Sequence, residues 1–202
     1  MKVLDLTRPL DERTVLWPGS VPFVADEDSD DDGFWWRNLR VPEHAGTHVD
    51  APRHLVESGD DVAAIPAERL VVPAVRIDGA TGLSAAGVEE WEREHGSVPE
   101  GSAVLLRTGW DGDPLAAPGF EGDAAELLVA RGVLGLGIDT LSVDACASTE
   151  FPVHRTTLPA GLWHLENLAG LDAVPPTGAT LVVGALKLPG GSGTPARVFA
   201  LV

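Results

Sequence analysis

The sequence predicts one α/β domain built on a mixed β-sheet. Stretches typical of strands alternate with stretches typical of helices, and several strand-like stretches follow one another without a helix between them. The 202 residues suffice for one substantial core, and no low-complexity tract divides them. We therefore expect residues 1–202 to form a single domain with both parallel and antiparallel strands.

The expected strands are short apolar or β-branched runs bounded by turn residues. They are residues 2–7, 71–77, 102–108, 133–138, 179–186 and 196–202. The expected helices begin at residues that can cap or start a helix. Ser84 can cap a helix that ends near Gly96, Asp123 can cap one that stops at Gly132, and Pro66 occupies a plausible first helical position.

Composition excludes several classes of protein. The net charge of -17 argues against nucleic-acid binding, which needs basic patches, and no apolar run is long enough to cross a bilayer. The single cysteine, Cys146, cannot form an internal disulfide, and it is a buried apolar residue more often than a nucleophile. Lys2 and Asp5 interrupt what would be the apolar part of a secretion signal, so we expect a cytoplasmic protein.

Two aromatic segments flank an acidic run. Trp17 stands beside a Pro-Gly turn and is either core or an exposed stacking surface, with core favoured. Asp26 to Asp32 begins like a calcium loop, but Leu39 stands where such a loop needs a bidentate glutamate, so we expect a solvated loop. Trp35 and Trp36 follow it, and we expect this region near the mouth of a pocket.

The segment from His44 to His54 reads H-A-G-T-H-V-D-A-P-R-H and holds three of the six histidines. Neutral imidazole and carboxylate are ligands that borderline divalent metals such as zinc accept. Gly46 allows a sharp turn between the first two histidines, and Pro52 disfavours a regular helix before His54. The segment therefore predicts an irregular loop or strand end that brings metal ligands together.

A second polar group lies between Gly137 and Leu168. Asp139 and Asp144 end or follow a strand, which is a favoured place for site residues in α/β sheets. His154 and Glu166 could complete a two-metal site, in which the ions lie about 3.5–4 Å apart, but spacing alone pairs them only weakly with the first cluster. His164 competes as a ligand, although we expect it to face opposite to Glu166 in a strand.

The histidine segment resembles the signature of the metal-dependent cyclase family, which includes bacterial kynurenine formamidases. Further blocks resemble the family in the same order along the chain: D-L-T-R-P-L at residues 5–10, V-L-W-P-G at 15–19, L-L-R-T at 105–108, G-I-D-T-L-S-V-D at 137–144, F-P-V-H at 151–154 and L-E-N-L at 165–168. The resemblance implies a swivelling β/β/α fold and a homodimer or larger homo-oligomer.

The resemblance also implies a role for each site residue. The implied metal ligands of a binuclear site are His44, His48, Asp50, His154 and Glu166, with both carboxylates shared. His54 would be the general acid/base and Trp17 would stack on an aromatic substrate. The two divalent ions would be zinc, or manganese, since both accept nitrogen and oxygen ligands.

This chemistry suits hydrolysis of an amide. A metal lowers the pKa of bound water to about 7, and an unligated histidine can protonate the leaving nitrogen. We expect hydrolysis of N-formyl-L-kynurenine to kynurenine and formate through a metal-bound hydroxide. Arg155 stands where formamidases often carry a second histidine, so an isatin-type hydrolase of a cyclic amide or a lactone is the alternative. A non-catalytic metal-binding protein is the alternative from another class.

Overall fold

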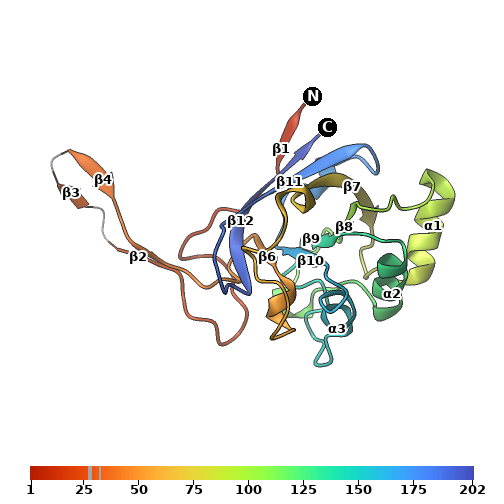
Figure 1. Ribbon diagram of the computed structural model, residues 1–202, viewed down its shortest axis with the longest axis horizontal. Coiled ribbons are helices and arrows are strands. Elements are labelled where there is room, and N and C mark those ends of the chain that lie inside the picture. The colour runs from red at the N-terminus through yellow and green to blue at the C-terminus, as the bar shows by residue number, and fades with distance from the viewer. Residues whose placement is uncertain (27–28, 32) are drawn as a thin grey trace.

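A computed structural model describes residues 1–26, 29–31 and 33–202, and it is organised around one eight-stranded sheet (Figure 1). The strands lie in the order β1-β12-β11-β7-β8-β9-β10-β6. Their bounds are β1 Val3–Asp5, β6 His48–Asp50, β7 Val71–Asp78, β8 Ala103–Arg107, β9 Gly135–Ile138, β10 Trp163–Glu166, β11 Ala179–Ala185 and β12 Gly193–Leu201. The strands expected from apolar runs therefore form, with ends that differ from the expected ones by at most three residues.

The sheet closes on itself because the short strand β6 pairs with both β10 and β12. Strands β7 to β10 run parallel to one another, and the other pairings are antiparallel. The prediction of a mixed sheet in an α/β domain is confirmed. Closure brings β6, which carries the histidine segment, against β10 from the C-terminal third of the chain.

Three helices connect the parallel strands and cover one side of the barrel-like sheet (Figure 1). They are α1 Ala85–His95, α2 Gly122–Ala130 and α3 Pro152–Thr157. The Ser84 hydroxyl accepts a hydrogen bond from Gly87 N, as a capping residue does, so that prediction is confirmed. The Asp123 prediction was wrong: Glu121 occupies the N-cap of α2, and Asp123 lies in its first turn.

Two apolar clusters hold the sheet and helices together. Successive residues of a strand point to opposite faces, so Leu105 packs in one cluster and Leu106 in the other. The second cluster joins the sheet to Val88 of α1, Leu128 of α2 and Val153 of α3. None of the helices in the described ranges has the length and apolar character needed to span a membrane.

A slender arm projects from the barrel (Figure 1). Two antiparallel ribbons build it, β2 Val24–Ala25 with β5 Leu39–Arg40 and β3 Ser29–Asp31 with β4 Phe34–Trp36. The expectation of a loop was thus wrong for residues 29–31, which pair as a strand. Residues 27, 28 and 32 of the acidic run lie outside the described part, and the comparison with a calcium loop depends on two of them.

Candidate metal centre and active site

Strands β6 and β10 place four polar side chains on one face. Asp50 pairs with His164 and His48 pairs with Glu166 across the two antiparallel strands. All four side chains are buried, while Val49 and Leu165 between them are fully buried in the apolar core. The expectation that His164 faces opposite to Glu166 was wrong, because residues two apart in a strand share a face.

Helix α3 and the loop before β6 supply the remaining histidines. His154 lies in α3, where its backbone N–H and that of Val153 donate to the Asp144 carboxylate at 3.1 and 2.8 Å. His154 Nδ1 lies 2.6 Å from Asp144 Oδ2, so this carboxylate fixes the orientation of the ring. His44 lies in the loop before Gly46, whose φ of 60° lets the chain turn into β6.

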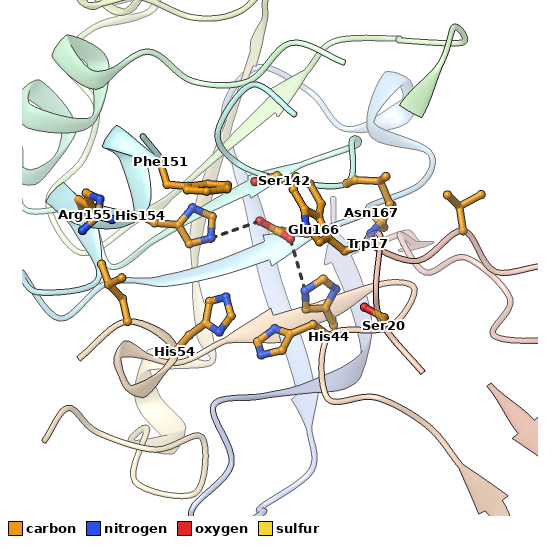
Figure 2. Close-up of a pocket in the computed structure, with 14 residues that line it drawn as sticks. Trp17, Ser20, His44, His54, Ser142, Phe151, His154, Arg155, Glu166 and Asn167 are labelled. Atoms are coloured by element: carbon orange, nitrogen blue, oxygen red, sulfur yellow. Dashed lines mark ion pairs between the residues drawn. The ribbon is translucent and has the colours of Figure 1, made fainter. Parts of the chain in front are cut away.

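The two buried carboxylates, Asp50 and Glu166, each lie between two sets of imidazoles. Figure 2 draws Glu166 and its ion pair with His154. His48 Nε2 is 3.2 Å from Asp50 Oδ1 and 3.4 Å from Glu166 Oε2. On the other side, His154 Nε2 is 3.7 Å from Asp50 Oδ2 and 3.8 Å from Glu166 Oε1. Each carboxylate therefore turns one oxygen toward each set, as a ligand shared by two ions does.

The donor atoms fall into two groups that could each hold a metal ion. One group is His44, His48 and Asp50, and the other is Asp50, His154, His164 and Glu166. Within each group the ligand atoms lie within 4.8 Å of one another. The five sequence-predicted ligands thus come together, and His164 joins them.

Unpaired buried atoms show that a cation fits this cluster. Among the described residues, His48 Nε2, Asp50 Oδ2 and His164 Nδ1 are buried without a hydrogen-bond partner. An unpaired buried polar atom costs free energy, and divalent ions would satisfy these atoms, one ion at His48 Nε2 in the first group and another at Asp50 Oδ2 and His164 Nδ1 in the second. The set of nitrogen and oxygen donors is one that zinc or manganese accepts.

In His44 and His48, one ring nitrogen makes a hydrogen bond directed away from the cluster, and the other ring nitrogen faces the cluster, where it could bind a metal. His48 Nδ1 lies 2.9 Å from Gly46 O, and a carbonyl only accepts, so Nδ1 carries a proton and donates it away from the cluster, which leaves Nε2 to face Asp50 and Glu166. Ser192 Oγ donates to Glu43 Oε2 at 2.6 Å and therefore accepts from His44 Nε2 at 2.8 Å. The sequence reasoning missed Glu43 and Ser192 because nothing in their spacing connects them with the cluster.

The electrostatics of the cluster favour positive charge. Burial lowers the pKa of the His154 imidazole, but the hydrogen bond to Asp144 and the charges of Asp50 and Glu166 raise that pKa to about 10. Burial likewise lowers the pKa of His48, and the same two carboxylates outweigh it and hold that pKa well above its ordinary value. A metal ion must therefore displace protons here, so its affinity falls as the solution becomes acidic.

His54 differs from the other histidines of the segment. It ends a short 3₁₀ turn, Pro52–His54, and its imidazole makes no hydrogen bond within the described part of the chain. Its ring centroid lies 4.0 Å from that of His44 and 5.8 Å from that of His154. His54 is thus beside both groups of donors without belonging to either, and its nitrogens remain available for proton transfer.

A pocket of about 340 Å³ opens over the cluster, with His44, His54 and His154 in its wall (Figure 2). Trp17 and Phe151 form an aromatic side of this pocket, with ring centroids 6.2 Å apart. The expectation that core burial is favoured for Trp17 was wrong, since its ring lines the pocket and is only partly buried.

Arg155 supplies a cation to the same wall. Trp35 and Trp36 lie on the arm and do not line this pocket, so the expectation that they lie at its mouth was wrong within one copy of the chain.

Comparison with known proteins gives a consistent set of similarities. A sequence profile of the family described as putative cyclase matches residues 4–145. An isatin hydrolase from Roseibium aggregatum is 32% identical over 89% of this chain and 79% of its own length. A kynurenine formamidase from Salinibacter ruber is 30% identical over 98% of this chain and 96% of its own.

Solved structures agree with these similarities. The structure of isatin hydrolase A from Labrenzia aggregata bound to benzyl benzoate has a TM-score of 0.90 and 33% identity, and the match covers 100% of this chain and 93% of that one. A structure described as a potential metal-dependent hydrolase with cyclase activity has a TM-score of 0.82 and 28% identity, with 98% of this chain and 96% of that chain covered.

Proposed function

Since this chain belongs to the putative cyclase family, we propose that it hydrolyses the formamide of N-formyl-L-kynurenine to kynurenine and formate. At the coarser level, the chain is a metal-dependent hydrolase of carbon–nitrogen amide bonds. One observation carries the proposal: two buried carboxylates lie between two sets of imidazoles, under a pocket that Trp17 and His54 line.

We assign the residues as follows. His44 and His48 would hold one divalent ion and His154 a second, with Asp50 and Glu166 shared between them, and zinc or manganese suits these donors. The ions supply Lewis acidity at the amide carbonyl and make water acidic enough to lose a proton near neutral pH. Trp17 stacks on the aromatic ring and orients the amide over the cluster.

His54 moves the proton that the reaction requires. Its neutral imidazole accepts a proton from the attacking water as the new carbon–oxygen bond forms. The same proton then passes to the amide nitrogen as the carbon–nitrogen bond breaks, so the arylamine leaves uncharged. One water is consumed, and the products are the amine and formic acid, which releases its proton to solvent to become formate.

The hydrolysis of N-formylkynurenine by purified protein, loaded in turn with zinc and manganese, tests the substrate. We expect metal-dependent turnover that chelation abolishes and metal restores. Protein that carries its metal and does not release kynurenine would rule this substrate out.

A cyclic amide of the isatin type is the second candidate. The isatin hydrolase structure covers the whole chain with a TM-score of 0.90, and Arg155 in the pocket wall could pair with the carboxylate that ring opening produces. Isatin therefore belongs in the same assay. A kcat/KM for isatin above that for N-formylkynurenine would reverse the assignment.

His54 should be neutral at physiological pH. Burial lowers its pKa below the ordinary value of 6.5, and the charges of Asp50 and Glu166 do not outweigh burial together with His44 and His154. In chelated protein, we expect NMR titration to show His54 losing its proton below pH 6.5, while His154 keeps its proton up to about pH 10. Comparison with the His54→Ala spectrum identifies the resonance, and a His54 midpoint above 6.5 would contradict its role as a base.

We propose in addition that the chain acts as a homodimer through its arm. Phe34 and Trp35 are each 73% exposed, and an isolated two-stranded ribbon is only marginally stable in water. Packing on a second copy would bury these rings. We expect light scattering to give a dimer for the wild type and a shift toward monomer for Trp35→Ser, with Trp110→Ser unchanged. A monomeric wild type would exclude this arrangement.

A further inference from the structure

His164 stands out because, among the described residues, only one of the two nitrogens of its buried ring has a hydrogen-bond partner. Its Nε2 lies 2.7 Å from Thr157 Oγ1, and Nδ1 has no hydrogen-bond partner in the part of the chain that the structure describes. The side chain is fully buried, which makes an unpaired nitrogen costly. A histidine that only filled the core would have both nitrogens paired.

The protons on His164 can be assigned from its neighbours. Thr157 Oγ1 donates to Val153 O at 2.7 Å, and a hydroxyl has a single proton to give. Thr157 Oγ1 must therefore accept from His164 Nε2, which carries the ring proton. His164 Nδ1 is left with a bare lone pair.

That lone pair faces a carboxylate. His164 Nδ1 is 3.7 Å from Asp50 Oδ2, too far for a hydrogen bond, and both atoms are buried and unpaired. Two electron-rich atoms held toward each other are stabilised when a cation binds both. Donor atoms on a tetrahedral zinc ion with bonds of about 2.0 Å lie about 3.3 Å apart, so a small inward movement suffices.

We propose that His164 is a protein ligand of the second divalent ion and coordinates it together with Asp50, His154 and Glu166. The proposal rests on the binuclear site of the proposed function and extends it by one residue. Four protein donors make a closed position of the structural kind, whereas a catalytic zinc keeps one position open for water or substrate. Donors of both positions line the pocket, with His44 and His48 at the first and His154 and Glu166 at the second.

A pair of amide variants separates the two nitrogens of His164. In His164→Gln, the side chain reaches to the place of Nε2 and can still donate to Thr157, but it puts no donor at the place of Nδ1. In His164→Asn, the shorter amide puts an oxygen near the place of Nδ1 and loses the contact with Thr157. A purely structural histidine would be replaced better by Gln, and a metal ligand better by Asn.

Equilibrium dialysis of chelated protein against zinc, with the metal bound per chain counted, tests the proposal. We expect two ions on the wild type and on His95→Ala, a histidine outside the cluster. His164→Gln should bind the second ion at least about 10–100-fold more weakly, since changes at outer partners of metal ligands already cost that much. His164→Asn should bind it more tightly than His164→Gln does.

Cobalt gives an independent readout of coordination, because four-coordinate Co²⁺ absorbs visible light more strongly than six-coordinate Co²⁺. The second equivalent should bring a strong band in the wild type and a weaker one in His164→Gln, and circular dichroism checks that the variant is folded. Two ions bound by His164→Gln with wild-type affinity would overturn the proposal, and so would a wild type that binds only one. Wild type that binds two ions without hydrolysing any amide would instead refute the proposed function and leave the role of His164 intact.

Discussion

His54→Ala should retain its metal and lose most of its activity. The imidazole contacts neither group of donors through a hydrogen bond, so its removal leaves the ligands in place. General acid–base catalysis by one side chain contributes about 10²–10⁴-fold, and we expect kcat to fall within this range. Steady-state kinetics with metal-saturated protein measures the loss.

The metal content of the same samples is the necessary control. Wild type and His54→Ala should bind the same number of ions, and His95→Ala should match the wild type in both kcat and metal. Turnover by His54→Ala within a few-fold of the wild type would remove the assigned role.

Asp50→Asn should have the second large effect, because it weakens both ions together. Asp50 Oδ1 lies 2.7 Å from His44 Nδ1 and 3.2 Å from His48 Nε2, while Oδ2 faces His154 and His164. An amide keeps the shape of the side chain but removes the negative charge that attracts both ions. We expect metal affinity to fall by more than about 100-fold at both positions and hydrolysis to approach the uncatalysed rate.

Asp144→Asn is the matched control for this carboxylate. Asp144 binds the far nitrogen of His154 and, among the described residues, makes no hydrogen bond or ion pair with another ligand, so its loss should cost about 10–100-fold in affinity at the second position alone. Metal counting distinguishes the two variants. Asp50→Asn protein with one tightly bound ion would show that the carboxylate is not shared.

The part of the site that the sequence predicts is the part that is local in the chain. His48 and Asp50 are two residues apart, so the period of a strand puts both on one face. His154 and Glu166 needed the family resemblance, because helix α3 carries His154 and only the pairing of β10 with β6 brings Glu166 beside the first cluster. That pairing depends on closure of the sheet, which no local pattern encodes.

The wrong predictions have physical causes as well. An acidic run beside two tryptophans resembles a loop at a pocket mouth, whereas the residues on both sides of the turn pair as ribbons in an arm. Trp17 looks like a core residue by composition, yet the pocket it lines is formed by segments distant in sequence. Side-chain partners such as Asp144 act through the backbone N–H groups of a short helix, which sequence reasoning did not predict.

The positions of the two ligand groups along the sequence have a consequence for unfolding. His44, His48 and Asp50 stay close together even in a denatured chain, which can therefore still chelate one ion weakly. His154, His164 and Glu166 lose Asp50, which lies far earlier in the chain, once β6 and β10 separate. A ligand that also binds the unfolded state stabilises the native state less, so the second ion should contribute more to resistance against urea than the first. Loss of the metal ions would then shorten the lifetime of the folded protein as well as abolish hydrolysis.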